Sequence, residues 1–402
     1  MSSRTYAVAN DADVQALATS VHFAFGGTIE GSEKWLRGAG LEHSRVIRSA
    51  AGGGGGPLVA SLLRIPMGQH FGGKSIPMLG IAGVTVMPEA RGQGHAKWMM
   101  GRAINEARAD GFPLSTLYAS TQSLYRSVGY EQAGHKCVTR LGIKGLSARA
   151  EANAPAIRPL GDRDEGAIRD CYQSYAANFA GALDRGPYVW ARTRLWRDEK
   201  YDGFGAFDSA NTLVGYLFLN QSRSLGATNG EIAVSDLAFT TPAAGRRLLA
   251  FLADFGTMFS HVTLQGPPLH PLVSLTDSRD FSLEKYEAWM LRICDVKKSL
   301  ETRGYPAHIK ATLELRVQDN VVFENEGSWT MHVEHGRAEV RKESAMHPAL
   351  TLDIRALAPL FSGLYTARQL RALGLAEGEN GAIAAADSIF GGFGSPWLGD
   401  FF

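Results

Sequence analysis

Cysteine is scarce in this sequence. Its three cysteines among 402 residues, Cys137, Cys171 and Cys294, lie far apart. They form no metal-ligand spacing and leave one thiol over after any pairing, which argues against a disulfide scaffold and against a Cys-ligated metal site. Each lies in an apolar or helical context that is typical of a buried structural thiol. We therefore expect no metal and a reduced, cytoplasmic setting.

The sequence also lacks net charge and long hydrophobic runs. Lys and Arg number 41 against 40 Asp and Glu, a formal charge of +1, and no basic run offers a local field to nucleic acid or an anionic membrane. No apolar segment approaches the ~20 residues that span a bilayer. The first five residues contain no apolar core of a signal peptide. We expect neither nucleic acid nor a membrane among the partners.

The length of the chain predicts more than one domain, because 402 residues are too many for a single core. We expect domains at 1–147, 148–290 and 291–402. The first alternates short strands with amphipathic helices, and the second begins in the same way. In the third, Trp329, Met331 and Val333 alternate with polar residues as one face of a strand. The predicted fold class is α/β with mixed sheets, two tandem units followed by a smaller α+β domain.

One stretch organises the first domain. Residues 81–86 are rich in β-branched side chains and end at Pro88, as a strand does. From Ala96 onward, apolar residues recur with the spacing of a core-facing helical stripe. Between strand and helix lie Gly92 and Gly94, where a ligand can approach the unpaired N–H groups of the first helical turn. Such a turn is an anion site suited to phosphate.

Two other glycine-bearing stretches give weaker signals. Residues 234–255 resemble a second copy of this strand, turn and helix, with Pro242 and Gly245 but without the Arg-x-x-Gly-x-Ala run, so we expect no phosphate there. The glycine run at 52–56 is followed by a strand and by no Gly-Lys-Ser/Thr, which favours a hairpin loop over a phosphate loop. The aromatic end of the sequence, up to Phe402, predicts a segment that docks into the rest of the protein.

The run from Arg91 to Ala96 resembles the acyl-CoA signature of the GCN5-related N-acetyltransferases. The segment from Leu124 to Tyr130 is similar to the closing segment of that superfamily. The order of the three domains and the aromatic end resemble the enhanced intracellular survival (Eis) family over essentially the whole chain. This resemblance implies two acetyltransferase-like domains, the second degenerate, and a sterol-carrier-like third domain. It also implies acetyl-CoA as co-substrate and a homohexamer.

The resemblance implies roles for individual residues. Tyr125 would be the general acid that protonates the leaving thiolate, and the carboxylate of Phe402 would be the base that accepts the proton of the amine. Tyr125 could instead be a structural tyrosine, and Trp35 a core tryptophan rather than part of the substrate pocket. His95 occupies a variable position of the signature, where we expect it to be exposed. The cofactor-binding residues would be Val84, Thr85, Val86, Arg91, Gly92, Gln93, Gly94, His95, Ala96, Lys97, Ser120 and Thr121.

The acceptor is the least determined part of the prediction. The resemblance implies a primary amine of a small polyamine, an aminoglycoside-like molecule or a lysine side chain. Members that acetylate aminoglycosides carry acidic residues in the pocket, at positions where this sequence has Phe401 and Phe25 or Gly26. With Trp35, these phenylalanines would give a more apolar substrate pocket. The alternative is a non-catalytic acyl-CoA or lipid-binding protein, in which the fold persists without turnover. The apolar strands of the third domain could line a lipid tunnel, but we favour a filled core.

Overall fold

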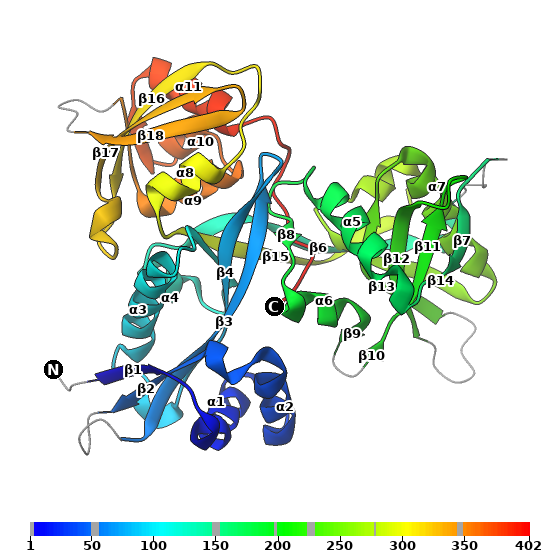
Figure 1. Ribbon diagram of the computed structural model, residues 1–402, viewed down its shortest axis with the longest axis horizontal. Coiled ribbons are helices and arrows are strands. Elements are labelled where there is room, and N and C mark those ends of the chain that lie inside the picture. The colour runs from blue at the N-terminus through cyan, green and yellow to red at the C-terminus, as the bar shows by residue number, and fades with distance from the viewer. Residues whose placement is uncertain are drawn as a thin grey trace.

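The computed structural model describes residues 4–49, 56–146, 153–196, 199–222, 230–276, 279–343 and 349–402, which fold into three lobes (Figure 1). The architecture is mixed α/β, as predicted. The glycine run at 52–56 lies, except for Gly56, outside the described residues. Within the described part of the chain, no helix is both long enough and apolar enough to cross a membrane.

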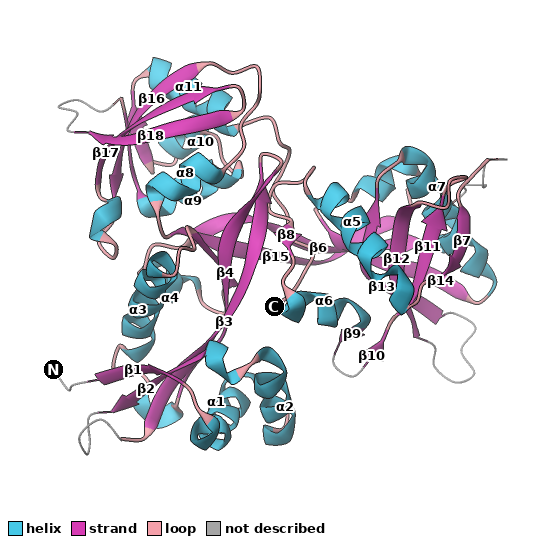
Figure 2. Ribbon diagram, viewed as in Figure 1, coloured by secondary structure: helices cyan, strands magenta, loops and turns pink. Residues whose placement is uncertain are grey.

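The first lobe contains the predicted strand, turn and helix. Its elements are β1 (Arg4–Val8), α1 (Val14–Phe25), α2 (Ile29–Ala39), β2 (Ser44–Ser49), β3 (Leu58–Phe71), β4 (Lys74–Val86), α3 (His95–Ala109), β5 (Leu114–Tyr118), α4 (Gln122–Arg126) and β6 (Glu131–Gly142). Figure 2 shows the helices flanking the strands. The stripe of α3 packs on one face of the sheet, with Leu62 and Ile81, and α1 packs on the other, with Val46 and Leu58.

The second lobe repeats this pattern. It contains β7 (Ala156–Pro159), α5 (Glu165–Ala176), β8 (Leu183–Asp184), α6 (Pro187–Arg194), β9 (Leu195–Trp196), β10 (Glu199–Lys200), β11 (Asp202–Phe207), β12 (Leu213–Ser222), β13 (Gly230–Phe239), α7 (Pro242–Ala253), β14 (Phe259–Gly266) and β15 (Phe281–Ile293). The strands of the first two lobes, apart from the separate β9–β10 pair, form one sheet in the order β1-β2-β3-β4-β5-β15-β6-β14-β13-β12-β11-β7, with β8 on β3.

The two lobes exchange strands within that sheet. β15 lies between β5 and β6, antiparallel to both, and β6 pairs on its other side with β14. β6, which the chain forms at the end of the first lobe, therefore continues into the second lobe, while β15, the last strand of the second lobe in the chain, pairs with β5 and completes the first. The predicted boundary at 290/291 falls inside β15, and the two lobes share one hydrogen-bonded sheet.

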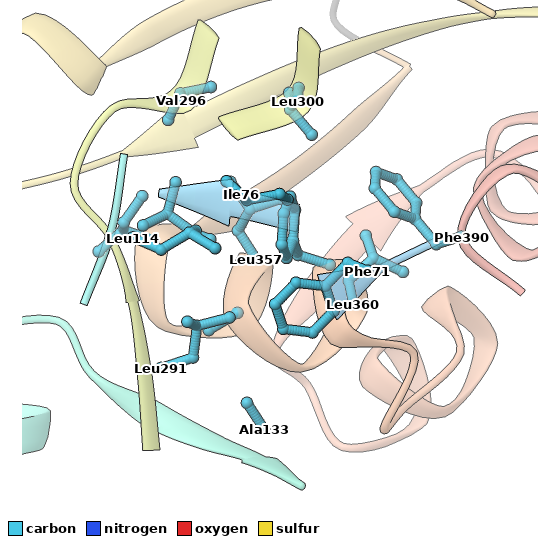
Figure 3. Close-up of a cluster of buried hydrophobic side chains, with 14 of the residues drawn as sticks. Phe71, Ile76, Leu114, Ala133, Leu291, Val296, Leu300, Leu357, Leu360 and Phe390 are labelled. Atoms are coloured by element: carbon cyan, nitrogen blue, oxygen red, sulfur yellow. The ribbon is translucent and has the colours of Figure 1, made fainter. Parts of the chain in front are cut away.

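The third lobe holds β15 and the β3–β4 hairpin in place. It consists of α8 (Val296–Thr302), β16 (Ala311–Gln318), β17 (Gly327–Glu334), β18 (Arg337–Glu343), β19 (Leu350–Asp353), α9 (Ile354–Ser362), α10 (Ala367–Ala372), β20 (Ala376–Gly378) and α11 (Asn380–Phe390). Trp329, Met331 and Val333 are buried, as the alternation predicted. The tip of the hairpin, with Phe71 and Ile76, lies among side chains of this lobe (Figure 3).

Candidate active site

An opening between β4 and β5 forms the centre of the site. The two strands pair in parallel only from Met78 to Gly80, opposite Leu114 to Thr116, and β4 then continues to Val86. Thr85 and Val86 still pair with β3, so the other edge of this stretch is left without β5 as a partner. The Thr85 hydroxyl is buried and lies 2.6 Å from the Ser20 hydroxyl and 2.8 Å from that of Ser61, which fixes the strand to α1. Among the described strands, only β3 pairs with residues 84–86, so their other backbone edge can pair with a ligand.

The glycine turn lies after the end of β4. Gly92 and Gly94 have φ values of +75° and +74°, which side chains rarely adopt, and a Cβ atom at either would meet nothing within 4 Å. The Trp98 N–H bonds the Gly94 carbonyl at 3.1 Å, so the N–H groups of His95, Ala96 and Lys97 precede the regular helical ladder. Open space beside unpaired N–H groups fits a pyrophosphate.

The side chains of the signature divide between solvent and core. Arg91, Gln93 and Lys97 are exposed, and the Gln93 carbonyl accepts a hydrogen bond from Arg4 at 2.8 Å. The expectation for His95 was wrong, since it is buried on the same side of α3 as Met99, one turn along the core-facing stripe. Burial, and then the nearby charge of Arg4, lower the pKa of its imidazole.

Tyr125 lies on α4, beyond the end of β5. Its ring is buried and contacts the Tyr130 ring edge-on at 6.1 Å. Burial raises the pKa of its hydroxyl to about 12, and a hydrogen bond with Ser120 acts in the opposite direction. Tyr125 is therefore protonated at neutral pH. The predicted neighbours Ser120 and Thr121 lie in the segment that connects β5 to α4, and the Thr121 hydroxyl is 3.4 Å from that of Ser123.

The end of the chain docks where β4 and β5 separate, in the middle of the molecule (Figure 1). The Phe402 ring is buried, and its atoms lie 2.9 Å from a Cβ built on Gly80. The Tyr118 ring of β5 stacks on Phe401 at 5.1 Å and lies 5.8 Å from Phe402. The Tyr118 hydroxyl donates to the Asp400 carbonyl at 2.6 Å. β5 thus holds the last two rings beside the opening.

The three aromatic residues that were predicted to line the substrate pocket lie in different environments. Trp35 lies against Gly83 of β4, where a Cβ would be 2.6 Å from its ring, and its indole N–H donates to the Tyr188 hydroxyl at 2.8 Å. Phe25 is 57% exposed at the end of α1. The structure therefore brings Trp35 to β4 and Phe401 to β5, on the two strands that separate, and leaves Phe25 at the surface.

Sequence reasoning missed the groups that hold the end of the chain. Arg185 is buried and donates to both oxygens of Asp236 at 2.7 Å, and it also contacts the Asp400 carboxylate at 2.8 Å. Burial raises the pKa of Asp400, and the positive charge of Arg185 opposes this. Asp236 lies near the end of β13 in the degenerate copy. Arg185, Asp236 and Asp400 are far apart in the sequence, so no local pattern connects them. The one sequence feature that could have indicated the docking of the last residues is Gly80 within β4, which lies beside the Phe402 ring.

The corresponding turn of the second lobe, at 239–245, differs from the glycine turn of the first. β13 and β14 also pair in parallel and part after Val234, but the segment through Trp397, Gly399 and Asp400 lies at this point. Gly245 of α7 has no positive φ, and a Cβ there would meet Leu275 and Phe239 at 3.0 and 3.1 Å. Gly245 therefore allows close packing of α7 against Leu275 and Phe239.

A cavity of about 350 Å³ opens beside Phe401. Its walls come from strands of both lobes and from α6, which makes it a shared feature of the exchanged sheet. Its lining includes Lys136 of β6, Arg192 of α6, Trp196 of β9 and Glu287 of β15.

Comparisons with known proteins agree with this geometry. Models of an acetyltransferase (GNAT) domain match residues 5–133 and 181–293, and a model of a sterol carrier protein domain matches residues 296–399. An uncharacterized N-acetyltransferase of Streptomyces avermitilis is 27% identical over 345 residues, 81% of this chain and 82% of that protein. The crystal structure of a GCN5-related N-acetyltransferase from Anabaena variabilis is 32% identical, with a TM-score of 0.92 over 100% of both chains. Eis1 from Mycobacterium abscessus, 22% identical, shares the fold, with a TM-score of 0.82 over 100% of both chains.

Proposed function

Because the chain belongs to the GCN5-related N-acetyltransferases, we propose that it transfers the acetyl group of acetyl-CoA to a primary amine by direct attack, with both substrates bound together. The observation that carries this proposal is the opening between β4 and β5, which has the glycine turn at one end and the Phe402 ring at the other. A donor that pairs with residues 84–86 would place its thioester near Gly80 and Tyr118.

In this proposal, the N–H groups from Gly92 to Lys97 hold the pyrophosphate of the donor, with Arg91 and Lys97 supplying positive charge. The acetyl thioester supplies the activated carbonyl. Ser120 and Thr121 would contact the donor beyond the end of β5. The exposed position of Arg91 and Lys97 and the open space at Gly92 and Gly94 support this assignment.

Tyr125 is proposed as the acid for the leaving sulfur. Its pKa of about 12 keeps the proton in place at neutral pH, which is the state that an acid requires. Complete transfer to a thiolate of pKa about 8.5 would be uphill by about 5 kcal/mol. We therefore propose that the hydroxyl donates a hydrogen bond that strengthens as charge develops on sulfur. The Ser120 hydrogen bond, which lowers the pKa of Tyr125, would assist.

The carboxylate of Phe402 is proposed as the group that accepts the proton of the amine. The contact of the Phe402 ring with Gly80, and the hold of Tyr118 and Arg185 on the preceding residues, support a fixed position for it. A carboxylate needs burial to become a useful base for an amine, and the buried Phe402 side chain is consistent with such an environment.

The test of Tyr125 is a comparison of two hydroxyl deletions. We expect Tyr125→Phe to lower kcat by about a hundredfold or more while the dissociation constant for CoA stays unchanged. Tyr130→Phe is the matched control, because its hydroxyl faces the buried Ser115 hydroxyl at 2.7 Å, and Ser115 keeps its bond to the Leu79 carbonyl. Thiol release from acetyl-CoA measures both variants. A Tyr125→Phe variant as active as Tyr130→Phe would remove the acid assignment.

The acceptor and the assembly need separate measurements. We propose a primary amine, with small polyamines, aminoglycoside-like amines and lysine side chains as the candidates that the family resemblance implies. A panel of these amines in the thiol-release assay would rank them, and the absence of acetylation across the panel would exclude these three acceptor classes. Light scattering tests the hexamer that the same resemblance implies.

A further inference from the structure

The cavity beside Phe401 contains a buried lysine for which the described part of the chain provides no anionic hydrogen-bond partner. The Lys136 side chain enters from β6, and the residue is 9% exposed. Its ammonium lies 4.7 Å from the centre of the Phe401 ring and 5.3 Å from that of Tyr118. Among the described residues, none is seen to accept a hydrogen bond from it. A buried ammonium without an acceptor is costly, and cation–π contacts offset only part of that cost.

The two acids of the cavity wall are held by other cations. Glu287 forms an ion pair with Lys285 at 2.8 Å. The Asp400 carboxylate is bound by Arg185 at 2.8 and 3.0 Å, and that arginine is itself held between Asp400 and Asp236. Both acids lie near enough to Lys136 to raise the pKa of its ammonium, but burial outweighs them and lowers it to about 8. Lys136 is thus still mostly charged at neutral pH and keeps its N–H donors for a ligand.

The remaining walls combine aromatic rings with a second cation. Trp196 meets Phe401 edge-on at 5.6 Å, and the Arg192 guanidinium lies 4.1 Å from the centre of the Trp196 ring. Arg192, Trp196 and Phe401 all line the cavity together with Lys136. A volume of about 350 Å³ is within the range of small-molecule pockets. Flat apolar walls next to cations favour a small apolar molecule that carries a negative charge.

The cavity is connected with the proposed reaction centre through Tyr118. That ring contacts Phe401 and Phe402 and lies below the Lys136 ammonium. A molecule anchored at Lys136 would therefore lie next to the rings at the end of the chain. A polycation in the same place would meet the like charges of Lys136 and Arg192, which disfavours it.

We propose that the cavity beside Phe401 binds the carboxylate of the acceptor, so that the preferred substrate is a primary amine on a small apolar body that also carries a carboxylate. Lys136 is the residue that recognises this carboxylate. The proposal rests on the proposed acetyl transfer and narrows its acceptor class away from polycations.

The test uses two amines that differ in the carboxylate alone, 4-(aminomethyl)benzoate and benzylamine. We expect the wild-type enzyme to favour the carboxylate-bearing amine by about tenfold or more in kcat/KM, mainly through KM, since a charge-assisted hydrogen bond has that strength. In Lys136→Met, the ratio should collapse to within about twofold. Lys310→Met is the control, because it removes one positive charge from a lysine of the third lobe that pairs with Glu334 at 2.7 Å and does not line the cavity. That variant should keep most of the preference.

A binding measurement without acetyl-CoA separates this proposal from the catalytic one. Calorimetry should detect benzoate binding to the wild-type protein and a loss of at least tenfold in affinity in Lys136→Met. If benzoate binds in this way while no amine is acetylated, the transferase proposal fails and the anion site stands. If benzylamine or spermidine is acetylated as well as 4-(aminomethyl)benzoate and benzoate does not bind, the anion site is wrong and the transferase proposal stands.

Discussion

Lys136 carries its charge at a cost to the folded state. Burial lowers the pKa of its ammonium from an ordinary 10.5 to about 8. Because the unfolded chain solvates this lysine fully, a shift of that size corresponds to a penalty of roughly 3 kcal/mol when the group is charged. The penalty is fully present below pH 8, where both states carry the proton. It fades between pH 8 and 10.5, where the unfolded state binds more protons than the folded one, so that stability rises with pH.

Replacement of Lys136 by methionine should therefore stabilise the protein in a pH-dependent way. We expect the free energy of unfolding of Lys136→Met to exceed that of the wild type by about 1 to 3 kcal/mol at pH 7. At pH 10 the difference should be much smaller. Urea denaturation at the two pH values measures it, with Lys310→Met, which breaks an exposed ion pair with Glu334, as a control that changes little at either. If the free energy of unfolding of Lys136→Met exceeded that of the wild type by the same amount at pH 7 and pH 10, the gain would come from the packing of the methionine and not from the lost charge.

Residues of the site were predictable where the signal is local. Gly92 and Gly94 stand between a strand and a helix in a short stretch, and both have the positive φ that only glycine adopts readily. Lys136, Arg185 and Asp236 carry no such signal, because what makes each of them unusual is a neighbour hundreds of residues away or on another element. The roles of Tyr125 and Phe402 came from a resemblance and stay predictions until they are measured.

The bounds of helices and strands could be predicted from the sequence more closely than the pairing of the strands. The expected strand ends at Val86, the expected helix begins at His95, and its apolar stripe is buried, because hydrophobic periodicity encodes which face of an element meets a core. The exchange of β6 and β15 was not foreseen. Alternating side chains show that a segment is a strand but do not specify its neighbour in the sheet, since backbone hydrogen bonds are the same for any partner.

Gly80 of β4 is the point at which this strand packs against the Phe402 ring. A Cβ there would lie 2.9 Å from the Phe402 ring and 2.3 Å from the end of the Met67 side chain, and the ring is the part that cannot bend aside. We expect Gly80→Ala to shift Phe402, lowering kcat about tenfold or more, while CoA affinity remains that of the wild type. Gly101→Ala on α3, where the nearest atom is 4.0 Å away, is the control. A wild-type kcat in Gly80→Ala would show that the position of Phe402 does not matter.

The third lobe connects the shared sheet with the end of the chain at the opening between β4 and β5. The chain passes from β15 in the shared sheet into that lobe and returns from α11 to place Phe401 and Phe402 in the opening (Figure 1). The Arg292–Asp319 pair fastens this connection: both side chains are fully buried, and the guanidinium donates to both carboxylate oxygens at 2.8 and 2.7 Å. On its other side, Arg292 lies 2.9 Å from a Cβ built on Gly129, just beyond α4 and Tyr125.

Loss of Asp319 should thus affect both stability and turnover. Asp319→Leu leaves the Arg292 charge buried without its partner and removes the acceptor of the Val321 and Val322 N–H groups, so we expect a loss of about 3 to 5 kcal/mol. A displaced Arg292 would also disturb the turn at Gly129. We therefore expect a kcat lower than that of the wild type at temperatures at which the variant is still folded. The double variant Arg292→Met/Asp319→Leu should recover part of the stability, because it buries no unpaired charge. Thermal unfolding and kcat of the wild type and the two variants provide the measurement. If the double variant is less stable than Asp319→Leu, the pair holds the lobe through its hydrogen bonds to the backbone and not through its charge.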